Sequence, residues 1–221
     1  MRNTSCNIAF GFHRQKTRAN WKFIHDNYID DYDYFVFGGD DYYLVVDNLR
    51  EYLASYEIRN ISERGVPLYL GRRFMMQGNV DDIFNSGGPS YILNRQALKI
   101  LYAHFEKPCC KPNMAQFYED LLIARCLRCV HPPVHAYDTR DAKGRERFLP
   151  FTPGAHLTYK VQNMTKLKRK HKKAPDWYHQ YSIDLKPGFD CCSPQSIGYH
   201  FVPPALMVQM DALLYGCRKK P

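Results

Sequence analysis

The alternation of short apolar runs with longer amphipathic segments most constrains the fold of this chain. The short runs end at turns rich in Gly, Pro or Asp, which is typical of buried strands. Between them, apolar residues recur at helical spacing. Strands are expected at 33–37, 67–70, 91–93 and 199–202, and helices at 15–28, 46–56, 96–105, 118–130 and 203–215. This order predicts an α/β fold with a mostly parallel sheet flanked by helices.

The length of 221 residues, 45% of them hydrophobic, suits one globular domain with a sizeable core. The chain shows no internal repeat and no domain boundary, so residues 1–221 are predicted to form one unit. The net charge of +9 favours anionic partners. Much of that excess lies between Lys166 and Lys173, where a solvated loop is the favoured explanation. Because no recognised nucleic-acid-binding motif is present, nucleic acid is not an expected partner.

The cysteines and glycosylation sequons point to the secretory pathway. An even number of cysteines with two adjacent pairs predicts disulfides in an oxidising compartment. Zinc is not favoured, because only Cys126 and Cys129 have knuckle spacing and they lie within an apolar helical pattern. Sequons occur at Asn3, Asn60 and Asn163. The eight cysteines are Cys6, Cys109, Cys110, Cys126, Cys129, Cys191, Cys192 and Cys217.

Neither a signal peptide nor a membrane-spanning stretch is recognisable in the sequence. A secretory protein needs such a signal to enter its compartment. We therefore expect the chain to be part of a longer protein whose true start precedes Met1.

Two aspartates directly follow the first predicted strand, in Gly39-Asp40-Asp41. Carboxylates at the end of a strand point into the crevice where α/β proteins bind ligands. Their hard oxygens suit Mg²⁺ or Mn²⁺ and could bridge the ion to substrate phosphates. The competing interpretation is a polar turn that caps the next helix.

Two further candidates are weaker when taken alone. Glu119-Asp120 begins a predicted helix, where a carboxylate could act as a general base or simply complement the helix dipole. His200 lies among apolar neighbours, where an imidazole could ligate a metal ion or fill a structural role.

Taken in chain order, these motifs and their flanks resemble the core 1 β1,3-galactosyltransferases, also called glycoprotein-N-acetylgalactosamine 3-β-galactosyltransferases, and more distantly the Fringe enzymes. The likeness covers nearly the whole chain, and its later segments discriminate best. The matching segments are 16–18, 21–24, 33–50, 67–74, 86–93, 119–121, 124–127, 138–148, 150–153, 191–193 and 199–204.

The resemblance implies a GT-A-type fold, here without its N-terminal strands, and an inverting transfer of galactose from UDP-galactose to the 3-hydroxyl of GalNAc on glycoproteins. It implies that Asp41 and His200 hold Mn²⁺ and that Asp120 is the general base. It places the donor against Asp40, Asp41, Gly87, Gly88 and Arg72, and the acceptor against Trp177 and Tyr178. For these two aromatic residues a plain packing role is the open alternative. The family is anchored in the Golgi or endoplasmic reticulum membrane as type II proteins, with the catalytic part in the lumen. The implied partners are a UDP-sugar, a GalNAc-bearing acceptor and, as an open alternative, a second copy in a homodimer.

The chain departs from the family pattern at two places within its length. Gly39 stands where the family has the first of three aspartates, a change expected to weaken donor binding. Pro89-Ser90 replaces Ala-Gly in the turn after Gly87-Gly88, which removes an N–H and adds a Cβ where glycine allowed any φ. These departures leave open a catalytically inactive relative that acts as a chaperone or binds glycans on the same scaffold.

Overall fold

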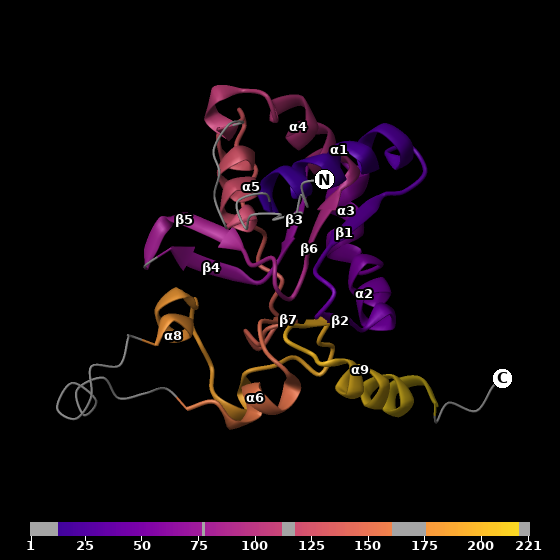
Figure 1. Cartoon of the computed structure of the whole chain (residues 1–221), viewed down its shortest axis with the longest axis vertical. Helices are drawn as coiled ribbons and strands as arrows, with labels where there is room; N and C mark the ends of the chain where they lie inside the picture. The colour runs from indigo at the N-terminus through magenta and orange to yellow at the C-terminus, as the bar shows by residue number, and fades with distance from the viewer. Residues whose placement is uncertain (1–12, 77, 112–117, 161–175, 217–221) are drawn as a thin grey trace, which may run out of the picture.

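The computed structural model describes residues 13–76, 78–111, 118–160 and 176–216. At its centre lies a three-stranded sheet in the order β1 (Tyr34–Phe37), β6 (Tyr91–Asn94), β3 (Tyr69–Gly71). All four residues of β6 are buried, because elements pack on both faces of the sheet (Figure 1). Successive side chains of a strand point to opposite faces, so β6 contributes to two cores.

The larger core lies on the face that carries Tyr91 and Leu93. It contains Trp21 of α1 (His13–Tyr28), Leu98 of α4 (Arg95–His104) and Leu127 of α5 (Glu119–Arg128). The smaller core lies on the opposite face. It contains Ile92 together with Leu49 of α2 (Val46–Leu53) and Ile58 of α3 (Tyr56–Glu63).

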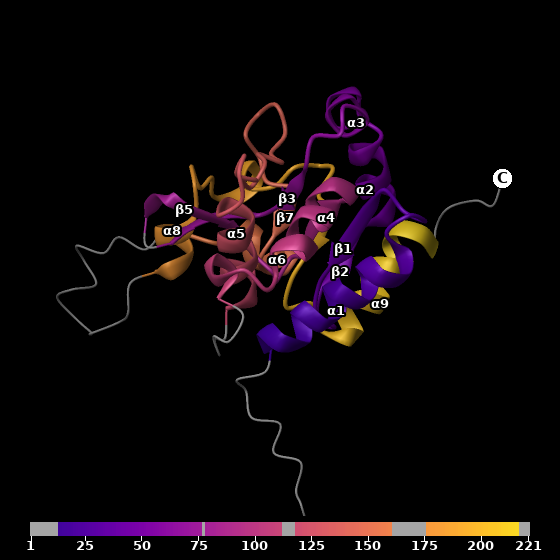
Figure 2. The ribbon, with the colours of Figure 1, turned by 90° about the horizontal axis from the view of Figure 1, so that it is seen from above.

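The remaining elements extend from this centre. A hairpin of β4 (Arg73–Met76) and β5 (Asn79–Asn85) packs against α8 (Trp177–Tyr181) at one side of the molecule (Figure 2). A second small sheet has the order β2 (Tyr43–Leu44), β8 (Gly198–Tyr199), β7 (Phe148–Leu149). The other elements are α6 (Pro153–Thr158), α9 (Pro204–Asp211), the short 3-10 turns η2 (Pro108–Cys110) and η3 (Gly188–Asp190), and a π-helical turn η4 (Ala212–Gly216).

The predicted mixture of helices and strands is confirmed, but the mostly parallel sheet is not. β6 pairs antiparallel with both β1 and β3. The reason lies in the connection: after β3 the chain runs out along β4, turns back along β5 and returns through β6. Within the described residues, the parallel pair of named strands is β7 with β8.

Several predicted boundaries also shift. The helix expected at 46–56 is divided into α2 and α3 at Ala54-Ser55, and the strand expected at 199–202 covers Gly198–Tyr199. The region 131–186, expected to be loop-like, contains β7, α6 and α8 among its described residues. None of the described helices combines the length and apolar character needed to cross a bilayer. Cys6, Asn3, Asn163, Cys217 and the run Lys166–Lys173 lie outside the described residues.

Disulfides tie α5 to the preceding turn. Cys109 pairs with Cys129 and Cys110 with Cys126, so both bridges join η2 to the C-terminal part of α5. Cys191 pairs with its neighbour Cys192. Cross-links over 20 and 16 residues restrict the unfolded chain and hold the helix in place.

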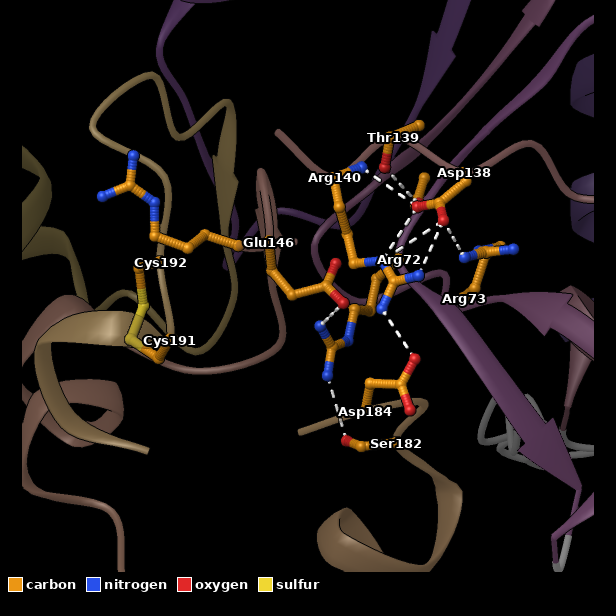
Figure 3. Close-up of polar contacts among 12 residues, drawn as sticks. Arg72, Arg73, Asp138, Thr139, Arg140, Glu146, Ser182, Asp184, Cys191 and Cys192 are labelled. Carbon is orange, nitrogen blue, oxygen red and sulfur yellow. Dashed lines mark hydrogen bonds and ion pairs between the residues drawn. A yellow bond between two sulfur atoms is a disulfide. The ribbon is translucent and has the colours of Figure 1, made fainter. Parts of the chain in front are cut away.

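A buried ion pair joins the central sheet to the later segments of the chain. Arg72, between β3 and β4, is fully buried and faces the carboxylate of Glu146 (Figure 3). Its Nη2 donates to Ser182 Oγ at 3.0 Å, and its guanidinium lies 5.3 Å from the Phe74 ring centre. Burial of an arginine requires such partners, because an unpaired buried charge is costly.

We expect Arg72→Met or Glu146→Gln to lower the free energy of unfolding by roughly 3 kcal/mol or more, because each leaves the other group buried without its counter-ion. The double variant Arg72→Met/Glu146→Leu should lose much less stability, because neither charge is left buried alone. Urea unfolding at neutral pH measures the difference. Arg59→Met removes an exposed pair with Glu63 and should change stability by less than about 0.5 kcal/mol. Single variants as stable as Arg59→Met would show that the buried pair is not required.

Candidate active site

One cavity of about 550 Å³ brings together most of the residues predicted to form the site. They come from the loop after β1, the turn after β5, the start of α5 and the residue after β8. The predicted residues in its lining are Asp40, Asp41, Gly87, Gly88, Asp120 and His200. Gly39 and Glu119, which belong to the motifs singled out in the sequence, also line it. The contributors to which the sequence gave no role in the site are Lys16, Thr17 and Asn20 of α1, Phe37, Gly38 and Tyr118.

Asp41 and His200 lie side by side in this cavity, although they are 159 positions apart in the sequence. His200 Nε2 is 3.3 Å from Asp41 Oδ2. The pairing of β2 with β8 brings the two segments together, and the Val202 amide donates to the Asp41 carbonyl at 2.9 Å. Burial lowers the pKa of His200, and the Asp41 charge opposes that shift. A neutral imidazole beside a carboxylate is a donor set that suits Mn²⁺.

Asp120 lies across the cavity at the first turn of α5. Its Oδ2 accepts a hydrogen bond from the Gly87 amide at 2.9 Å, and its Oδ1 accepts one from the Leu121 amide at 2.8 Å. Burial raises the pKa of Asp120, while these amides act in the opposite direction. A raised pKa strengthens a carboxylate as a proton acceptor, which suits a general base.

The turn formed by residues 87–90, called here the glycine turn, separates Asp120 from His200. A Cβ on Gly87 would lie 2.5 Å from Glu119 Oε1, and a Cβ on Gly88 would lie 2.4 Å from His200 Nδ1. Both distances are too short for any real side chain. The two glycines therefore allow the acidic and the imidazole side chains to approach the turn from its two sides.

Glu119 has contacts that neither interpretation of the sequence, as a general base or as a complement to the helix dipole, predicted. The Tyr91 hydroxyl donates to Glu119 Oε2 at 3.2 Å, and Trp21 Nε1 donates to the Tyr91 hydroxyl at 3.0 Å. Burial first, and then the Asp120 charge, raise the pKa of Glu119 well above its usual range, although the Tyr91 hydrogen bond opposes this. The sequence singled out Glu119 together with Asp120, but it held no signal for the contact with Tyr91.

A second cavity of about 720 Å³ also has Asp120 and Tyr118 in its lining. Aromatic residues dominate the rest of its wall: Phe74 and Phe84 from the hairpin, and Trp177 and Tyr181 from α8. Trp177 is half-exposed there, so its ring is available to a ligand. Aromatic faces of this kind pack against the apolar faces of ligands.

The structure places Tyr178 and Arg72 away from both cavities. Tyr178 is buried among Phe151, His156 and Phe74, and its hydroxyl lies 3.5 Å from Arg72 Nη2. Arg72 is engaged with Glu146. Of the residues predicted to contact donor or acceptor, these two are not brought to the candidate site.

The comparisons with known proteins point to glycosyltransferases. The chain is 30% identical over 218 residues to glycoprotein-N-acetylgalactosamine 3-beta-galactosyltransferase 1 of Xenopus laevis, an alignment that covers 96% of this chain and 55% of that protein. It is 33% identical over 117 residues to chondroitin sulfate synthase 3 of Homo sapiens and of Mus musculus, covering 48% of this chain and 12% of each synthase. No family model matches the chain.

The chain is thus a relative of glycosyltransferases, and it spans about half the length of the Xenopus protein. Within that class, the resemblance inferred from the motifs is confirmed: the chain is related over nearly its whole length to the core 1 β1,3-galactosyltransferases.

We expect Ser90→Gly to raise the free energy of unfolding by about 1 kcal/mol. Ser90 is fully buried at φ 74°, a left-handed conformation that costs a non-glycine residue energy, and among the described residues its hydroxyl has no hydrogen-bond partner. Ser90→Ala keeps the strain and removes the hydroxyl, so it separates the two causes. Chemical denaturation measures both variants, and a destabilised Ser90→Gly would contradict this account.

We expect Glu119→Gln to stabilise the protein more at alkaline than at acidic pH. The raised pKa means that the folded state holds the Glu119 proton more tightly than the unfolded state does. The contribution of Glu119 to stability is fully present at pH values below its pKa in the unfolded state. It is lost as the pH rises through its pKa in the folded state, because the buried side chain must then become charged. Glutamine does not ionise, so it does not lose stability in this way. Unfolding free energies of both proteins at about pH 5 and about pH 8 test this. A stabilisation equal at both pH values would show that Glu119 titrates normally.

Proposed function

We propose that this chain is the catalytic part of a Mn²⁺-dependent, inverting β1,3-galactosyltransferase on a GT-A-type fold. It would transfer galactose from UDP-galactose to the 3-hydroxyl of GalNAc linked to Ser or Thr on glycoproteins. The observation that carries the proposal is the convergence of Asp41, His200 and Asp120 on one cavity. The similarity to a protein named as a galactosyltransferase supports the same reaction class.

Asp41 and His200 would hold the metal ion, because they supply one carboxylate and one imidazole at neighbouring positions. When bound, Mn²⁺ acts as a Lewis acid that neutralises the charge gathering on the leaving UDP. Asp40 lines the same cavity and adds a carboxylate on the donor side. Lys16 is the one Lys or Arg among the described lining residues, and its ammonium favours an anionic donor.

Asp120 would accept the proton of the acceptor hydroxyl as that oxygen attacks the sugar. Its two oxygens already accept hydrogen bonds from the Gly87 and Leu121 amides, which fix the direction of the carboxylate. A single displacement of this kind inverts the anomeric centre and needs no covalent nucleophile.

The acceptor would occupy the second cavity, because that cavity shares Asp120 with the first. Trp177 is the predicted acceptor aromatic that lines it. For Tyr178 we propose an indirect role, as the buried ring against which Trp177 packs with a centroid distance of 5.9 Å. Location in the Golgi or endoplasmic reticulum lumen, a membrane anchor and a homodimer remain predictions.

We expect UDP to bind the purified protein with Mn²⁺ and not with EDTA, as measured by calorimetric titration on the longest natural form. Asp41→Ala and His200→Ala should abolish the Mn²⁺-dependent binding because each removes a metal ligand. Asp120→Asn should retain that binding and lose transfer to a GalNAc acceptor by at least ~100-fold, because the base is gone.

Normal turnover by Asp120→Asn would disprove the base assignment. A folded protein that binds no UDP would point to the non-catalytic alternative, a chaperone or glycan-binding protein on the same scaffold. Lys99→Ala serves as the control, because its exposed pair with Asp30 lies outside both cavities.

A further inference from the structure

Glu119 is the carboxylate in the candidate site to which the proposed mechanism gives no role. It precedes Asp120, lines the same cavity and is partly buried. Its carboxylate also belongs to a hydrogen-bond chain that reaches the core of the molecule. A carboxyl group that is tied to the core beside the proposed catalytic base calls for a functional account.

The hydrogen bonds of this series run in one direction, from Trp21 through Tyr91 to Glu119. Trp21 Nε1 is only a donor, so it donates to the Tyr91 hydroxyl oxygen, and the Tyr91 proton is then available to Glu119 Oε2. Trp21 on α1 and Tyr91 on β6 are both fully buried, and their rings lie 6.0 Å apart. The Glu119 carboxylate is therefore tied to two rigid elements of the fold rather than to mobile surface groups.

Glu119 and Asp120 hold Gly87 from two directions. Asp120 Oδ2 accepts from the Gly87 amide at 2.9 Å. Glu119 Oε1 occupies the space that a Gly87 side chain would fill, 2.5 Å from the position of its Cβ. Removal of the Glu119 carboxyl group would leave a gap beside Gly87 and allow the glycine turn to move away from Asp120.

The other ionisable groups near Asp120 do not hold it in this way. In the described part of the first cavity these groups are Lys16, Asp40, Asp41, Tyr118 and His200. In the second cavity they are Arg125, which pairs with Asp82, and Tyr181. Among the hydrogen bonds of the described residues, none joins any of these side chains to the Asp120 carboxylate.

We propose that Glu119 is a positioning residue: anchored by Tyr91 and Trp21, it keeps the Gly87 amide against Asp120 and so directs the Asp120 carboxylate toward the acceptor hydroxyl. The catalytic consequence rests on the proposed function, whereas the structural consequence for Gly87 does not. A displacement of about 1 Å in a reacting group can cost ~100-fold in rate, so the effect should be large.

The test compares Glu119→Ala, Glu119→Gln and Tyr91→Phe, with Tyr137→Phe as the matched control. Tyr137 donates to Glu57 in a second Tyr–Glu pair that lies outside both cavities. Transfer from UDP-galactose to a GalNAc acceptor gives kcat and KM. Amide hydrogen exchange of Gly87, followed by NMR, reports its hydrogen bond to Asp120 without any need for turnover.

Glu119→Ala should lower kcat by ~10- to 100-fold with the donor KM nearly unchanged, and should speed Gly87 exchange at least ~10-fold. Glu119→Gln keeps the acceptor for Tyr91 and the same shape, so it should restore both values to within about threefold of wild type. For Tyr91→Phe, kcat and the Gly87 exchange rate should lie between those of Glu119→Ala and Glu119→Gln. For Tyr137→Phe, both values should match wild type. Tyr91→Phe also provides the test if Glu119→Ala does not fold.

Wild-type kcat and slow Gly87 exchange in Glu119→Ala would overturn the proposal. So would a Glu119→Gln variant as impaired as Glu119→Ala, because that result would mean that charge rather than position matters. If the wild-type protein transfers no sugar, the proposed function fails. Gly87 exchange in the same variants then decides by itself whether Glu119 positions the turn.

Discussion

The buried pair of Arg72 and Glu146 joins the three segments on which both cavities depend. Arg72 follows β3 of the central sheet, and Glu146 lies just before β7. The Leu149 carbonyl of β7 accepts from the His200 amide at 3.0 Å, so the position of Glu146 is transmitted to a candidate metal ligand. On its other side Arg72 bonds Ser182, directly after the helix that carries Trp177. One guanidinium thus connects the central sheet to the segments that carry His200 and Trp177, the proposed metal ligand and the proposed acceptor contact.

The glycine turn is the second constraint, because four neighbours fix its shape. Gly87 faces the two acidic side chains and Gly88 faces His200. The Pro89 carbonyl lies 2.4 Å from where a Gly198 Cβ would be, so β8 also packs against the turn. Ser90, at the end of this turn, adopts a left-handed backbone conformation. Strain of this kind persists only where surrounding structure determines the conformation, and it often marks a functional site.

The sequence predicted the elements of this fold better than their directions. The apolar runs that became β1 and β6 were recognisable, but a buried antiparallel strand has the same continuous apolar pattern as a parallel one. The residues of the candidate site could likewise be predicted only in part. Asp41, Asp120 and His200 could be named through the family resemblance, and the structure brings them to one cavity. Trp177 and Tyr178 could not be separated, because adjacent residues of a short helix point in different directions.

The geometry of the cavity shows what a glycine at position 39, in place of an aspartate, changes. A Cβ at this position would lie 3.0 Å from Asp41 Oδ1, so an aspartate there would press on the proposed metal ligand or require it to move. With glycine instead of aspartate at position 39, the cavity has one carboxylate fewer, and it still contains Asp40, Asp41, Glu119 and Asp120. Less negative charge reduces repulsion of an anionic donor, while the lost side chain reduces direct contact with it. Both effects act on donor affinity. Since the two proposed metal ligands and Asp120 remain in place, we expect the substitution to alter how tightly the proposed donor binds rather than how its sugar would be transferred.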